Sequence, residues 1–166
     1  MRTIGIIGLG HVGRLVANEL MAMAAVDKLV LIDQDDDLAL AVQTDLLDAL
    51  PAMRTQPQII IQDYAALATA QVLVVAVGDS ALTKDDPMAE LTVAGRAVMQ
   101  IALRVKGSGF HGLVVNLTDP NEAVTAFLQQ QLQLPTKQVL GIGTVLDTAR
   151  LYRAIAHAAH VAPANV

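Results

Sequence analysis

Apolar residues alternate along this chain between short runs and longer stretches with helical spacing. The short runs are rich in Val, Ile and Leu and cover residues 3–7, 29–32, 58–61, 72–77, 113–117 and 139–142. Such runs predict strands of a sheet covered on both faces. Between them apolar side chains recur every three or four residues, as in Val12, Leu15, Val16, Leu20 and Met23, then Leu38, Val42, Leu46 and Leu50, and later Val93, Ala97, Ile101 and Val105. Strands that alternate with helices predict a parallel α/β sheet.

A glycine-rich turn joins the first predicted strand to the first predicted helix. Gly8, Gly10 and Gly13 carry the spacing, with His11 and Val12 between the last two. The first glycine permits a tight turn, the second lets a pyrophosphate approach the backbone, and the third lets helix and strand pack closely. The helix then directs free N–H groups and the positive end of its dipole at an anion. We therefore assign all five residues to a dinucleotide site; the alternative is a turn that serves close packing only.

Asp33 lies twenty residues after Gly13, at the end of the second apolar run. A carboxylate at this place can accept hydrogen bonds from both ribose hydroxyls of adenosine. NADP would bring its 2′-phosphate against Asp33 and the aspartates at 35–37, and each close like-charge pair costs up to about 4 kcal/mol at an intermediate effective dielectric. No arginine closely follows Asp33 to receive such a phosphate. The expected cofactor is NAD.

The order of the elements predicts the complete fold. Six strands in this sequence fit a doubly wound Rossmann sheet, whose ligand lies beyond the carboxyl ends of the strands. Four further residues fall near such ends and are assigned to the cofactor site, namely Val77, Gly78, Asp79 and Asp119.

Length and composition fit one domain of this kind. The chain has 166 residues, 54% of them hydrophobic, so we expect one domain over residues 1–166. No apolar run approaches the roughly 20 residues that span a bilayer, and no secretory signal opens the chain. A net charge of −5 and 2% aromatic residues argue against nucleic acid as a partner. The absence of cysteine is compatible with the cytoplasm, where we expect the protein.

Metal binding receives little support from the sequence. His157 and His160 are three residues apart on a predicted helix, but no Asp or Glu follows them at ligand spacing. We therefore expect these histidines on an exposed face, and the aspartates at 35–37 in a solvated loop.

Three passages resemble the L-lactate and L-2-hydroxyisocaproate dehydrogenase family, most closely its hydroxyisocaproate branch. They are residues 106–112 (Lys-Gly-Ser-Gly-Phe-His-Gly), 118–120 (Thr-Asp-Pro) and 141–150 (Gly-Ile-Gly-Thr-Val-Leu-Asp-Thr-Ala-Arg). With the glycine turn, they extend the resemblance over essentially the whole chain. The resemblance implies reversible hydride transfer between NAD and a small 2-hydroxy or 2-oxo acid.

The same resemblance implies two catalytic roles. Asp147 would orient a catalytic histidine, and Arg150 would hold the substrate carboxylate in a two-pronged ion pair. These roles suit a buried aspartate and a planar guanidinium. From spacing alone, the two residues fit a surface salt bridge on a helix better, worth about 0.2–0.5 kcal/mol.

The chain departs from the family pattern in three places. The family's catalytic histidine, in a Gly-x-His-Gly motif, would lie beyond Val166, so we expect no turnover by this chain alone. Pro87 stands where the family has a loop arginine, for which Lys84 is a weak substitute. Asp119 stands where the family has a neutral amide that contacts the substrate oxygen. Asn116 is a poor replacement, because it lies in the strand and points to the opposite face.

Two hypotheses follow. The first is the NAD-binding domain of an L-2-hydroxyacid dehydrogenase, with a homo-oligomer suggested by the resemblance and by the high apolar content. The second is a free-standing NAD-binding or sensor module without catalysis. The sequence names neither the 2-hydroxy acid nor the oligomeric state.

Overall fold

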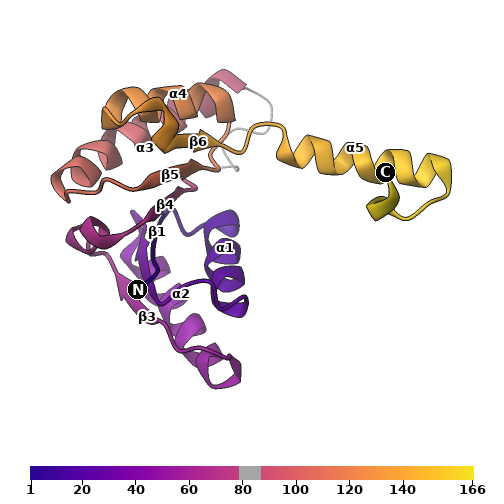
Figure 1. Ribbon diagram of the computed structural model, residues 1–166. Coiled ribbons are helices and arrows are strands. Elements are labelled where there is room, and N and C mark those ends of the chain that lie inside the picture. The colour runs from indigo at the N-terminus through magenta and orange to yellow at the C-terminus, as the bar shows by residue number, and fades with distance from the viewer. Residues whose placement is uncertain (79–86) are drawn as a thin grey trace.

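The computed structural model describes residues 1–78 and 87–166, and its centre is a parallel sheet in the order β3-β2-β1-β4-β5-β6 (Figure 1). The strands are β1 Thr3–Ile7, β2 Lys28–Ile32, β3 Gln58–Ile61, β4 Val72–Val75, β5 Leu113–Asn116 and β6 Val139–Gly141. The order reverses between β1 and β4, which is the switch point of a Rossmann sheet. The predicted fold class is confirmed. The second, fourth, fifth and sixth strands differ from their predicted ranges by one or two residues at one end.

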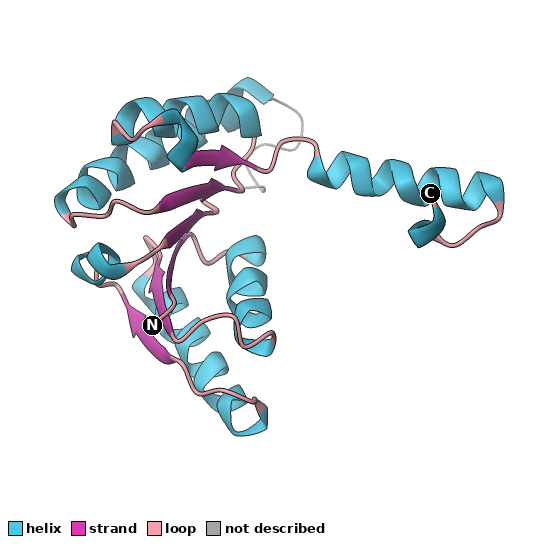
Figure 2. Cartoon of the chain, viewed as in Figure 1, coloured by secondary structure: helices cyan, strands magenta, loops and turns pink. Residues whose placement is uncertain are grey.

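Helices cover both faces of this sheet (Figure 2). Their bounds are α1 His11–Ala22, α2 Asp36–Ala49, α3 Pro87–Gly107, α4 Asn121–Leu132 and α5 Val145–Ala159. The buried side chains of α1 and α2 form one core cluster, and those of α3 and α4 form another. Successive residues of β2 alternate between the clusters, with Leu29 and Leu31 in the first and Val30 and Ile32 in the second. Because every side chain of such a strand is covered, the strand reads as a continuous apolar run.

The buried face of α1 coincides only in part with the one that its apolar spacing marks. Gly13, Ala17 and Met21 are buried, whereas Val12, Leu15 and Met23 are more than half exposed. Small residues turn toward the sheet because the helix lies very close to β1. Val16 and Leu20 are partly buried and pack against the core, so the periodicity predicted the helix correctly but only part of the side it buries.

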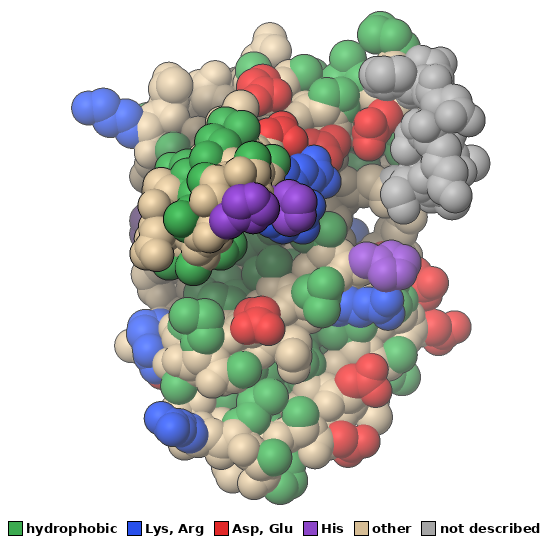
Figure 3. Space-filling model, turned by 90° about the vertical axis from the view of Figure 1, so that its right-hand side faces the viewer, with side chains coloured by type: hydrophobic (Ala, Val, Ile, Leu, Met, Phe, Trp, Pro, Cys, Tyr) green, Lys and Arg blue, Asp and Glu red, His purple; other side chains and the backbone are tan. Residues whose placement is uncertain are grey.

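The last helix, α5, projects away from the body of the molecule (Figure 1). Ala156 is its only buried residue, although it carries large apolar side chains that are more than 40% exposed at Val145, Leu146, Leu151, Tyr152 and Ile155. Figure 3 views the molecule from this side, where apolar side chains gather on the projecting part and a hollow lies beneath it. Within the described residues, no helix is long and apolar enough to cross a membrane.

The turn between β1 and α1 is closed by two glycines with different roles. Gly8 has φ +93°, and a Cβ there would lie 2.3 Å from the carbonyl oxygen of Ala76. Gly13 has ordinary helical geometry, but its Cβ would lie 1.8 Å from the carbonyl oxygen of Gly8. Both obstacles are backbone atoms, so neither can be relieved by a side-chain rotation.

Gly13→Ala is expected to lower the free energy of unfolding by about 2 kcal/mol, because the cost of overpacking exceeds the gain in helix propensity. Gly10→Ala is the matched control, since a Cβ there meets nothing within 4 Å. Urea unfolding of both variants checks the expectation. Equal stability of the two would contradict the close contact.

An ion pair fastens the start of the chain to the loop before β2. The backbone N–H of Arg2 donates to Asp27 Oδ2 at 2.6 Å, and its guanidinium donates to Asp27 Oδ1 at 2.6 Å. The side-chain hydrogen bond from Arg2 is the main cause that lowers the pKa of Asp27 from 3.8 to about 2. A lowered carboxyl pKa stabilises the fold above the unfolded-state pKa, and that stabilisation is lost as the carboxylate protonates in the folded state.

Asp27→Asn is therefore expected to be less stable than the parent chain at pH 6, and the difference should shrink as the pH falls from about 4 to about 2. Thermal unfolding across this range measures it, with Asp45→Asn on the exposed side of α2 as the control. A difference that stays constant down to pH 2 would show that the ion pair does not cause it.

Candidate dinucleotide-binding site

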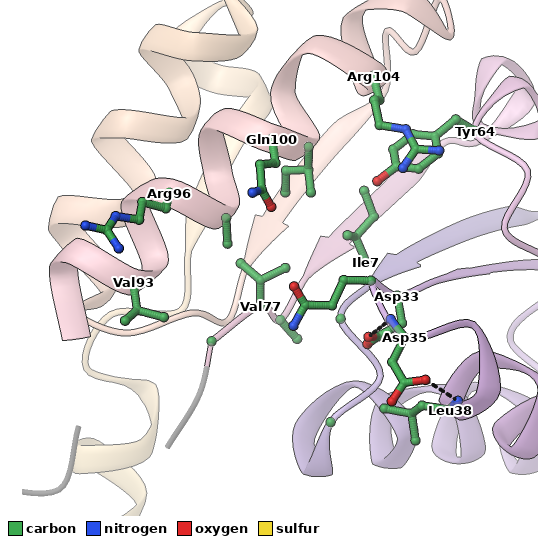
Figure 4. Close-up of a pocket in the computed structure, with 17 residues that line it drawn as sticks. Ile7, Asp33, Asp35, Leu38, Tyr64, Val77, Val93, Arg96, Gln100 and Arg104 are labelled. Atoms are coloured by element: carbon green, nitrogen blue, oxygen red, sulfur yellow. Dashed lines mark hydrogen bonds between the residues drawn. The ribbon is translucent and has the colours of Figure 1, made fainter. Parts of the chain in front are cut away.

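A cleft of about 470 Å³ opens at the carboxyl ends of β1, β2 and β4 (Figure 4). Five of the residues predicted for the cofactor line it, namely Gly8, Gly10, Asp33, Val77 and Gly78. The volume falls in the range of small-molecule and cofactor sites. The structure therefore brings together residues that are up to 70 positions apart in the sequence.

The floor of the cleft is the glycine turn and the start of α1. Gly10 has extended backbone and precedes the first helical residue, with no side chain capping the helix. The first N–H groups of α1 are thus left for an anion, and the helix dipole adds to their attraction. A phosphate can approach Gly10 because the space at its Cα is open.

Asp33 is held in place by the backbone around it. Its Oδ2 accepts a hydrogen bond from Leu9 N at 2.6 Å, and its Oδ1 accepts one from Asp35 N at 3.0 Å. The side chain is half-buried at the edge of the cleft. A carboxylate offers about four acceptor sites, so both oxygens retain capacity for hydroxyl donors.

Gln62, directly after the neighbouring strand β3, fixes the backbone of Asp33. Its Oε1 accepts from Asp33 N at 3.0 Å, its Nε2 donates to Asp33 O at 2.9 Å, and the same Nε2 donates to Asp36. Gln62 follows β3, where no motif marked it. Asp35 caps α2 by accepting from Asp37 N and Leu38 N, so the expected solvated loop is in part the start of a helix.

Three polar side chains of the cleft come from α3, and sequence reasoning missed all of them. Arg96, Gln100 and Arg104 follow each other at intervals of four residues and line the cleft. The guanidinium of Arg104 lies 3.9 Å from the ring centroid of Tyr64, which follows β3. Burial is the main cause that raises the pKa of Tyr64, and the charge of Arg104 opposes it. The signal that could have found them is their spacing of four residues along one face of the helix.

Four further predicted cofactor residues, which the structure describes, do not line this cleft. His11 and Val12 are exposed on the first turn of α1, and Gly13 is buried beneath it. Asp119 is exposed after β5. Asp79 and Lys84 lie outside the described residues. No cluster of three or more potential metal ligands occurs in the part of the chain that the structure describes.

Asn116 is fully buried at the end of β5. Its Nδ2 donates to Thr118 O, to Asn121 O and to Thr125 Oγ1, while its Oδ1 accepts from Thr118 N. Asn121 in turn accepts from Gly143 N at 2.9 Å. The amide of Asn116 is thus occupied by structural hydrogen bonds and is not available to a substrate.

Asp147 and Arg150 form an ion pair on exposed α5. Arg150 Nη1 donates to Asp147 Oδ1 at 3.1 Å. The side chain of Arg150 is 59% exposed and that of Asp147 is 72% exposed. Exposed pairs of this kind contribute about 0–1 kcal/mol. In this structure their geometry is that of the surface salt bridge that the spacing alone favoured, and the aspartate is not buried.

Known proteins share this architecture and part of this sequence. A family model described as the lactate/malate dehydrogenase NAD-binding domain matches residues 2–141. The L-lactate dehydrogenase of Fusobacterium nucleatum is 31% identical over 161 residues, which make up 96% of this chain and 50% of that protein.

Solved structures agree with this result. The minor L-lactate dehydrogenase from Enterococcus mundtii, in a ligands-bound form, matches with a TM-score of 0.90 at 28% identity, over 98% of this chain and 52% of that one. The lactate dehydrogenase from Cryptosporidium parvum, solved with lactic acid and NAD, has the same fold, with a TM-score of 0.90 at 24% identity over 98% of this chain and 51% of that one. The chain spans about half the length of the relatives it matches. It belongs to the lactate/malate dehydrogenase family, in which it corresponds to the NAD-binding domain.

Proposed function

We propose that the chain binds NAD as the nucleotide half of an L-2-hydroxyacid dehydrogenase that acts on a small 2-hydroxy or 2-oxo acid of the lactate or 2-hydroxyisocaproate type. The observation that carries this proposal is the position of Asp33, whose carboxylate lines the same cleft as Gly8 and Gly10. Phosphate would meet the turn and the N-terminus of α1, while ribose hydroxyls would donate to Asp33. When bound, NAD supplies the hydride acceptor or donor of the reaction.

The charges around Asp33 support NAD over NADP. Asp35 and Asp36 lie two and three residues after it, and Asp33 is held at the edge of the cleft by hydrogen bonds from the N–H groups of Leu9 and Asp35. The arginines of the cleft come from α3, and Arg104 is directed at Tyr64 (Figure 4). A 2′-phosphate on the ribose would therefore meet carboxylates first.

We further propose that α5 carries the substrate-facing residues of the complete enzyme. Arg150 would exchange its ion pair with Asp147 for a two-pronged pair with the substrate carboxylate, and Asp147 would then orient the catalytic histidine. The exposure of both side chains supports this role, because neither has to leave a buried partner. Since the chain matches about half of its relatives, the domain of residues 1–166 would bind the cofactor without turning over substrate. Its location in the cytoplasm stays a prediction.

The exposed apolar side chains of α5 support a homo-oligomer. Leu151, Tyr152 and Ile155 lie close together on that helix and are 43–56% exposed. Exposed apolar groups of this kind mark an interaction surface.

The cofactor assignment predicts that NADH binds at least tenfold more tightly than NADPH, measured by calorimetry or by nucleotide fluorescence. Asp33→Asn should weaken NADH binding by about tenfold, because hydrogen bonds to charged groups contribute about 1.5–3 kcal/mol. The same change should reduce the ratio between the NADPH and NADH dissociation constants. Gly10→Ala should weaken both nucleotides equally, since its Cβ would obstruct the phosphates that they share. Wild-type binding of NADPH as tight as that of NADH would overturn the assignment to Asp33.

The oligomer proposal predicts self-association in light scattering at concentrations of about 100 µM, where dimers with micromolar dissociation constants form. Ile155→Asp should shift the protein toward the monomer, because it places a charge on the apolar side of α5. Leu103→Asp is the matched control, as Leu103 is 76% exposed on α3. A monomeric parent chain would refute the proposal.

A further inference from the structure

The strand at one end of the sheet, β3, has one long side without a partner strand. It pairs with β2 on the other side, and in the described part of the chain no strand lies beyond it (Figure 1). Residues 58–62 read Gln-Ile-Ile-Ile-Gln, an uncharged segment in which the three isoleucines favour a strand. An open edge of this composition is a template for pairing with a second chain.

The backbone hydrogen bonds of β3 identify the groups that face the open edge. Gln58 N and Gln62 N donate to carbonyl oxygens on the side of β2, at 2.9 and 2.8 Å. Successive residues of a strand direct their N–H and C=O groups to opposite sides of the strand. The backbone groups of Ile59 and Ile61 therefore face outward, away from β2.

One of these outward groups is occupied by a side chain of α2. Gln43 Nε2 donates to Ile59 O at 3.1 Å, and the glutamine is half-buried. Its neighbour Val42 belongs to the core cluster against which Ile59 and Ile61 pack, so α2 is fixed beside this end of the sheet. The helix thereby holds an amide at the place where the N–H of an added strand would donate to Ile59.

The residue directly before β3 protects the edge in a second way. By the same alternation, residue 57 faces outward, and it is a proline, which has no backbone N–H. An added strand would find no donor there, and prolines in sheets are confined to such outer positions. Among residues 57, 59 and 61, Ile61 alone then offers an added strand both a donor and an acceptor.

We propose that Gln43 protects the edge of β3 from pairing with β3 of a second copy of this chain. Its amide occupies the carbonyl oxygen of Ile59, and Pro57 offers no donor, so a second copy forms too few hydrogen bonds to stay attached. Removing the amide frees the carbonyl oxygen and lets two sheets join edge to edge. This contact differs from the association proposed for α5, which uses exposed apolar side chains, and it does not rest on the proposed binding of NAD.

Gln43→Met tests the amide, because methionine is of similar length and has no N–H to donate. This variant should form aggregates that bind thioflavin T about fivefold faster than the reference chain at the same concentration. The reference and all variants carry Ile155→Asp, so that association through α5 does not contribute.

Gln129→Met is the matched control. Gln129 is also half-buried on a helix, and its Nε2 donates to Leu134 O at 2.9 Å, but it lies on α4 and not beside β3. Its aggregation rate should stay within about twofold of the reference. Each variant loses one hydrogen bond from a side chain to the backbone, so their thermal unfolding midpoints should be similar. A faster rate in Gln43→Met alone is then not a consequence of general destabilisation.

Hydrogen exchange locates the contact in the associated Gln43→Met protein. The N–H groups of Ile59 and Ile61 should become protected there, because they donate to the added strand. Gln58→Lys in the same protein should return the rate to within about twofold of the reference, since lysine on an edge strand opposes pairing. Gln58 is exposed on β3, so this change leaves the core intact.

Three results would overturn the inference. One is an equal aggregation rate for Gln43→Met and Gln129→Met. Another is faster association in which the newly protected N–H groups lie outside residues 57–62. The third is a rate that stays high after Gln58→Lys is added. None of these measurements uses a nucleotide, so a failure of the proposed function to bind NAD is distinguishable from a failure of this inference.

Discussion

The close contact of Gly13 with the carbonyl oxygen of Gly8 is the constraint on which the cleft depends. It holds the first turn of α1 against the end of β1 at a distance that no side chain allows. Because the helix lies so close, its N–H groups are aimed at the cleft and its small residues face the sheet. The end of the neighbouring strand β2 is tied to the same turn, through Gly8 N to Ile32 O at 2.9 Å and Leu9 N to Asp33 Oδ2 at 2.6 Å. The phosphate-binding turn and the ribose acceptor are therefore positioned by one local packing arrangement.

A second set of contacts positions the other half of the sheet. The buried amides of Asn116 and Asn121 join the end of β5 to the start of α4, and Asn121 accepts from Gly143 N beyond β6. A Cβ on Gly141 would lie 2.3 Å from Asn121 Oδ1, so this segment also passes at very short range. Buried amides are costly unless every donor and acceptor is satisfied. This network consequently fixes the point at which the chain leaves the sheet to form α5.

The cleft is electrostatically divided. Carboxylates of Asp33 and Asp35 lie on the side of β2 and α2, whereas α3 contributes Arg96 and Arg104 on the opposite side. Such an arrangement suits a ligand whose sugar hydroxyls donate to the carboxylates on one side. Its acceptor-rich or planar groups would then face the arginines on the other side. It also shows why the acidic net charge of the chain does not by itself describe the site.

The sequence by itself determined the six strands along the chain, the glycine turn and Asp33, because each depends on local properties: apolar periodicity, the space available at a turn, and the residue that ends a strand. Only the tertiary structure decided which face of α1 is buried, since that depends on how closely the helix approaches β1. It also brought Tyr64, Gln100 and Arg104 to the cleft, and Gln62 to the backbone of Asp33, from segments that carry no motif. Asp147 and Arg150 show the same distinction, because their spacing predicts an ion pair, whereas their exposure follows from a helix that projects beyond the sheet. Local chemistry repeats along the chain and can be recognised in sequence, but contacts between distant segments exist only after the sheet and its helices have packed.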